Sequence, residues 1–139
     1  MSTSAAILFS ASALIVLVLG GVHLFYTYVG PKLYPRDRAL VDRMREVPLV
    51  ISPRTTTWKA GIGFHASHSL GALLFGTLYL YLAHEPTHLL ASSPFLLAVG
   101  GGYLVAMTIL AKAYWFNIPL AGMSLALCAY AAAVVVLVA

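Results

Sequence analysis

The fold is decided by an uncharged apolar run near the start of the chain, AAILFSASALIVLVLGGVHLFYTYV at residues 5–29. A transmembrane helix needs about 20 consecutive apolar residues, so this run is long enough to cross a bilayer. Three further apolar runs follow, at about residues 57–82, 94–112 and 118–138. The sequence therefore predicts an all-α, polytopic membrane protein, with a single four-helix transmembrane domain over residues 1–139.

The composition supports a membrane protein and excludes several other classes. Of the 139 residues, 61% are hydrophobic and only 9% are charged, whereas a soluble domain carries about 25% charged residues. Four spans of about 20 residues leave too little chain for a soluble catalytic domain or a separate nucleic-acid module. We therefore expect membrane lipid as a partner and no nucleic acid, although the net charge is +4.

The basic residues are concentrated in the first loop. Seven of the eight lie from the end of the first apolar run to the start of the second: Lys32, Arg36, Arg38, Arg43, Arg45, Arg54 and Lys59. Short loops rich in Lys and Arg stay in the cytoplasm under the positive-inside rule. The sequence therefore predicts a multi-pass protein of the inner (plasma) membrane, with loop 30–57 cytoplasmic and both termini outside.

The same loop has a helical hydrophobic pattern at about residues 36–47. Pro35 suits the first turn of a helix, and Pro48 ends the pattern. Four apolar residues fall on one face at helical spacing: Leu40, Val41, Met44 and Val47. We expect a short amphipathic helix at the membrane interface, and the alternative is a charged, solvated turn.

Three histidines are expected at one depth in the membrane. His23 lies about six residues before the end of the first apolar run, while His65 and His68 follow Lys59 by about six and nine residues. At 1.5 Å per residue these positions are roughly 9 to 14 Å from the cytoplasmic boundary. Ionisable residues at this depth are costly and mark candidate functional sites. Polar neighbours that could complete the site are Tyr26, Ser69 and Asn117.

Several ligands suit this histidine layer. Neutral imidazoles bind first-row transition metals, so His23, His65 and His68 are candidate metal ligands. Haem b is a second cofactor candidate, with His23 and one histidine of the second helix as axial ligands. A lipophilic small molecule could instead place a polar head at the histidines, and an anionic head would suit the loop arginines. Inward-facing carboxylates are absent, which excludes a di-iron carboxylate site.

The alternative to a ligand site is a structural role for the histidines. Hydrogen bonds between helices in bilayers contribute only about 0.6 kcal/mol on average. Gly63, Ser67 and Gly71 recur every four residues and would allow a neighbouring helix to approach closely. The protein would then be a homo-oligomer or an accessory or scaffolding subunit of a larger membrane complex. The sequence leaves open whether the protein is an enzyme.

Three segments carry a resemblance to known proteins: WKAGIGFHASHSLG at 58–71, HLF at 23–25 and YWF at 114–116. They resemble a family of small uncharacterised bacterial four-helix inner-membrane proteins. The resemblance implies the four-helix membrane architecture and brings no established activity, cofactor or site residue with it. Membrane enzymes that conjugate glutathione are similar in size, but their Arg-rich second-helix motif is absent, which argues against that activity.

Overall fold

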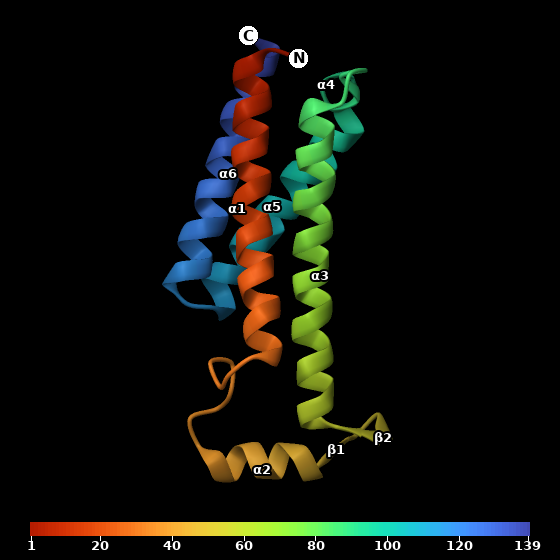
Figure 1. Ribbon diagram of the computed structural model, residues 1–139, viewed down its shortest axis with the longest axis vertical. Helices are drawn as coiled ribbons and strands as arrows, with labels where there is room; N and C mark the ends of the chain where they lie inside the picture. The colour runs from red at the N-terminus through yellow and green to blue at the C-terminus, as the bar shows by residue number, and fades with distance from the viewer. The chain divides into compact units, whose positions relative to one another are not determined.

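The computed structural model describes all 139 residues and is mostly helical. Four helices are long and apolar enough to cross a membrane, as Figure 1 shows: α1 (Thr3–Tyr28), α3 (Thr57–His84), α5 (Pro94–Tyr114) and α6 (Asn117–Val138). Their ends lie within two residues of the bounds expected from the sequence. The predictions of a multi-pass, helical protein are therefore confirmed at this level.

Where the sequence predicts one domain, the structure has two compact units that share the long helices α1 and α3. The terminal unit comprises Met1–Leu19 and Ala72–Ala139, and the loop unit comprises Gly20–Gly71. Both chain termini lie at the same end of the terminal unit (Figure 1). This arrangement agrees with an even number of membrane crossings.

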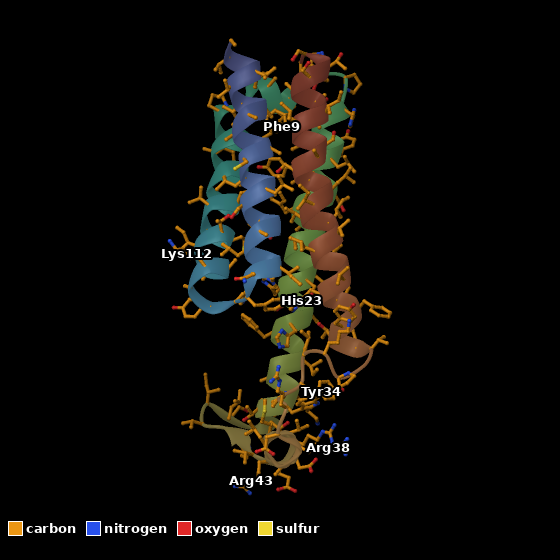
Figure 2. The ribbon with its side chains drawn as sticks, turned by 90° about the vertical axis from the view of Figure 1, so that its left-hand side faces the viewer. Phe9, His23, Tyr34, Arg38, Arg43 and Lys112 are labelled. Carbon is orange, nitrogen blue, oxygen red and sulfur yellow. The ribbon has the colours of Figure 1, made fainter.

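Aromatic rings form the centre of the terminal unit. Phe9 is buried and packs edge to face on Tyr130, with ring centroids 5.1 Å apart; Figure 2 labels Phe9. The hydroxyl of Tyr79 donates to the carbonyl of Leu96 at 2.7 Å, and that of Tyr130 donates to Leu97 at 2.9 Å. Buried tyrosines need such partners because an unpaired hydroxyl is costly in an apolar core. These bonds fix α3 and α6 against α5.

Two glycines mark close approaches between helices of the terminal unit. A Cβ atom added at Gly76 of α3 would overlap the side chain of Leu17 and lie 2.8 Å from the carbonyl oxygen of Ala13. At Gly122 of α6 it would lie 2.8 Å from Leu19 Cδ1. Because both positions lack a side chain, α1 can pack directly on α3 and α6 at these points.

The turn after α3 is organised by a buried carboxylate. Glu85 accepts hydrogen bonds from the Thr87 hydroxyl at 2.6 Å, the Thr87 amide at 2.8 Å and the Leu89 amide. These bonds, the Thr87 hydroxyl first, hold the pKa of Glu85 below its ordinary value of 4.5. The carboxylate therefore supplies an acceptor at the start of the short helix α4 (Leu89–Ser92). This helix is not predicted from the sequence.

The first loop folds within the loop unit. Its helix, α2 (Arg38–Glu46), lies across the end of the α1 and α3 segments of this unit (Figure 1). Asp37 caps the helix by accepting a 2.9 Å hydrogen bond from the Ala39 amide. The placement of Pro35 in the first helical turn is therefore wrong, because the cap at Asp37 starts the helix three residues later. Of the expected apolar face, Val41 is buried but Leu40 stays exposed.

A small antiparallel hairpin follows α2 and adds a sheet to the expected all-α fold. It consists of β1 (Pro48–Leu49) and β2 (Ser52–Thr56), with Leu49 paired to Ser52. Thr57 then ties the hairpin to α2, because its amide and hydroxyl both donate to the Val47 carbonyl, at 2.9 and 3.2 Å. Strands of two to five residues are too short to produce a recognisable alternation in the sequence.

Candidate functional site: a histidine cluster and its cavity

The loop unit brings the three predicted histidines together. His23 lies near the end of α1, and His65 and His68 lie in the third and fourth turns of α3. The Nε2 atom of His23 is 3.2 Å from the Nδ1 atom of His65, within hydrogen-bond distance. The rings of His23 and His68 meet edge to face, with centroids 5.4 Å apart. We call these three residues the histidine cluster.

The hydroxyl groups nearest the cluster bond to the backbone. Thr27 donates to the carbonyl of His23, and Ser69 donates to the carbonyl of His65, both at 2.8 Å. Both residues are buried, and bonds of this i to i−4 type satisfy a hydroxyl inside its own helix. Ser69, which the sequence analysis expects at the site, therefore adjoins the cluster and bonds to its backbone.

Two other predicted site residues lie in different surroundings. The hydroxyl of Tyr26 accepts a 2.9 Å hydrogen bond from Lys32, whose ammonium group also lies 4.3 Å from the centre of the Tyr26 ring. This cation–π contact engages Tyr26 at the end of α1. Asn117 is exposed at the first residue of α6 and belongs to the terminal unit.

The bond between His23 and His65 defines what the cluster can do chemically. Only one of the two facing nitrogens can carry a proton, since a hydrogen bond needs one donor and one acceptor. The outer nitrogens, Nδ1 of His23 and Nε2 of His65, are the other donor and acceptor positions of the pair. Such a pair can bind a hydroxyl or carbonyl group and can pass a proton to or from it.

The positions of the three histidines can be compared with the needs of the two cofactor candidates, a transition metal and haem b. No group of three or more His, Cys, Asp or Glu side chains is arranged to hold a metal ion, so metal binding by His23, His65 and His68 stays a prediction. Axial nitrogens on one iron must be about 4 Å apart, twice a metal–imidazole bond, with the macrocycle between them. His23 and His65 are in direct contact at 3.2 Å, so this pair does not fit haem.

A cavity of about 40 Å³ adjoins the cluster at His65. It is lined by residues of α1, the first loop, α2 and α3: Thr27, Leu33, Tyr34, Pro35, Met44, Trp58, Gly61, Ile62 and His65. The Tyr34 ring packs edge to face on Trp58 with centroids 4.7 Å apart. A cavity of this size holds about one water molecule or one small polar group, and it is too small for a porphyrin.

Most residues of the cavity wall are not apparent from the sequence. Trp58, Gly61, Ile62 and His65 share one face of α3, and their spacing of three, four and seven residues is the signal that could have grouped them. Tyr34 comes from an irregular loop, which has no periodicity to reveal it. Figure 2 shows Tyr34 between His23 and Arg38 along the loop unit.

No family model matches this chain, and no curated protein and no solved structure is significantly similar to it. The resemblance to small four-helix inner-membrane proteins therefore depends on the quoted segments alone. The function must be argued from the histidine cluster and the residues around it.

Proposed function

We propose that this chain is a membrane protein that binds the polar head of a lipophilic small molecule at His23 and His65. The observation that carries the proposal is the direct imidazole pair beside a small cavity. His65 lines that cavity and is bonded to His23 at 3.2 Å. The pair supplies a hydrogen-bond donor and an acceptor where the surrounding side chains are largely apolar.

The size of the cavity defines the class of ligand. About 40 Å³ accommodates a hydroxyl or carbonyl group, so the remainder of the molecule must lie outside the cavity. Phe64 precedes His65 on α3 and is 70% exposed, and it offers an apolar surface for that remainder. Proton transfer by the imidazole pair to the bound head would make the protein a small membrane enzyme.

The orientation of the chain is part of the proposal. Six basic residues between α1 and α3, together with Lys59 in the first turn of α3, favour a cytoplasmic loop unit in the inner membrane, with both termini outside. The ligand would then enter from the cytoplasm or from the inner leaflet. Tyr34 and Met44, between α1 and α3 in the chain, line the cavity, so this segment would contact the bound head.

The binding prediction concerns molecules that remain bound during purification. We expect an apolar oxygen-bearing compound to be extracted from the wild-type protein and identified by mass spectrometry. His65→Ala should lower its content about tenfold, the effect of losing a hydrogen-bond partner worth about 1.4 kcal/mol. His84→Ala is the matched control, because His84 is hydrogen-bonded to Ser10 in the terminal unit, and this substitution should leave the content unchanged.

The same samples separate the cofactor alternatives. A Soret band or a stoichiometric metal that is lost in His65→Ala would replace the proposed ligand by haem or by a metal site. Equal amounts of compound in the wild type, His65→Ala and His84→Ala would assign the histidines a structural role, and the proposal would be wrong.

A second candidate function, an accessory or scaffolding subunit, is favoured by an unused helix face. Gly63, Ser67 and Gly71 are exposed along α3. A Cβ atom added at Gly63 or Gly71 would meet no atom of the chain within 4 Å. In this chain the stripe does not pack on a neighbouring helix, so it is free to contact another copy or another subunit.

Oligomer formation tests the second candidate function. We expect Gly71→Leu to shift assemblies to monomers in native mass spectrometry, because a leucine would separate two helices that pack through the stripe. Gly102→Leu is the matched control, since Gly102 of α5 is also exposed and has no atom within 4 Å. Assemblies that survive Gly71→Leu, or that are lost equally in both variants, would exclude the stripe as the interface.

A further inference from the structure

We propose that the loop unit holds a second site, a pocket for a phosphate-bearing anion formed by Arg36, Arg38 and Arg45. We call it the arginine pocket. Its volume is about 410 Å³, and Pro31, Tyr34 and Asp42 also line it. A volume of 300 to 1,000 Å³ is typical of small-ligand sites, so the pocket can accept a phosphate group together with the group it esterifies.

The charges in the arginine pocket are unbalanced in favour of an anion. Three guanidinium groups face one carboxylate, that of Asp42. Arg45 lies 3.5 Å from Asp42 and stacks over the Trp58 ring at 5.2 Å, which holds its side chain in place. No hydrogen bond or ion pair in the structure involves the Arg36 or Arg38 side chain. Two cations are therefore left for a ligand.

The arrangement differs from a general accumulation of loop charge. The positive-inside rule depends on the number of basic residues in a loop and requires no concave surface. Arg43 illustrates the difference, because it pairs with Glu46 at 3.9 Å on the exposed face of α2 and does not line the pocket. Guanidinium groups bind phosphate through paired hydrogen bonds with matching geometry, so two of them in one pocket favour a phosphate.

The arginine pocket is a separate site from the histidine cluster and does not depend on the proposed function. Tyr34 and Pro35 line both the pocket and the smaller cavity, but no histidine lines the pocket. The phosphate can belong to the headgroup of an anionic lipid in the adjacent leaflet or to a soluble phosphate. Both sources share the chemistry that the arginines recognise.

Two charge-matched variants of the full-length chain test the proposal. Arg36→Gln with Arg38→Gln removes two charges inside the pocket, whereas Arg43→Gln with Arg54→Gln removes two charges from the same loop outside it. Each protein is purified in neutral detergent and titrated with phosphatidylglycerol, with phosphatidylcholine as the comparison lipid, by native mass spectrometry. Inorganic phosphate and glycerol phosphate are titrated separately by calorimetry.

We expect the pocket variant to weaken binding of the probe at least tenfold and the control variant to change it less than twofold. Phosphatidylglycerol binding with weak phosphate binding assigns the pocket to a lipid headgroup, and the opposite pattern assigns it to a soluble anion. Equal losses in the two variants would show non-specific attraction to the loop charge and would overturn the proposal. Binding that is unchanged in the pocket variant would overturn it as well.

The substituted arginines are chosen so that their replacement should not affect folding. Arg36 and Arg38 are exposed and unpaired, so the pocket variant should keep the helical circular dichroism and the Tm of the wild type. If the double variant unfolds, the single substitutions Arg36→Gln and Arg38→Gln replace it, each compared with Arg43→Gln. A loss of binding in His65→Ala alone would concern the histidine site and would leave the arginine pocket unaffected.

Discussion

Gly100→Ala is expected to destabilise the terminal unit by about 1–3 kcal/mol, the usual cost of overpacking a close-packed core. A Cβ atom at Gly100 would lie 2.5 Å from both the hydroxyl oxygen of Tyr130 and the Cε1 atom of Tyr79. Neither ring can move easily, because their hydroxyls are bonded to the carbonyls of Leu97 and Leu96. The added methyl group must therefore break a hydrogen bond or separate α5 from its neighbours.

The two following glycines of α5 are matched controls. A Cβ atom at Gly101 would be 3.6 Å from the Tyr130 ring, an ordinary contact, and one at Gly102 would meet nothing within 4 Å. Alanine is favoured over glycine in a helix by roughly 0.5–1 kcal/mol. Gly102→Ala should therefore unfold at an equal or higher denaturant concentration in detergent, followed by circular dichroism. Equal changes in stability for the alanine substitutions at Gly100, Gly101 and Gly102 would contradict the close approach at Gly100.

The sequence predicts the long helices well because a bilayer imposes a minimum length on an apolar helix. The runs at residues 5–29 and 118–138 contain no charge, so their ends can be placed to within two residues. The elements of the loop are different. The start of α2 depends on whether Pro35 lies in the first turn or Asp37 caps the helix. The hydrogen bond from the Ala39 amide to the Asp37 carboxylate shows that Asp37 is the cap.

Close helix packing is harder to predict, because a small residue allows another helix to approach but does not show which helix does so. The sequence points to Gly63 and Gly71, yet the tight contact on α3 is at Gly76, against Ala13 and Leu17. Gly100 belongs to a triplet of glycines, of which it alone meets a neighbour closer than 3.0 Å. Which of the three positions requires a glycine depends on the aromatic rings that pack against it, and these rings belong to other helices that are distant in the sequence.

The candidate site also combines a feature that the sequence predicts with hydrogen bonds that it does not predict. The shared depth of His23 and His65 follows from the helix ends and the rise per residue, and the two rings do meet. Tyr26 and Ser69 have nearer partners in Lys32 and the backbone of His65. A side chain that forms a local hydrogen bond of this kind is less available to a ligand site, and the sequence does not show which of the two interactions will form.

The orientation of the chain should give an all-or-none result in cysteine labelling. In a Cys128→Ala background, Arg43→Cys is expected to resist a membrane-impermeant maleimide in intact cells, whereas Thr87→Cys should react. The reason is the distribution of Lys and Arg, since six lie between α1 and α3, Lys59 lies in the first turn of α3, and none lies between α3 and α5. Arg43 is chosen because its side chain is 72% exposed and lies outside the arginine pocket.

Permeabilised cells provide the control for this prediction, because both cysteines should react once the reagent reaches both sides of the membrane. A cysteine at position 43 that reacts in intact cells, with position 87 protected, would invert the topology. The arginine pocket would then face the outside, and a cytoplasmic phosphate could not be its ligand. An outer-leaflet or periplasmic anion would have to take its place, and the histidine cluster would be reached from that side as well.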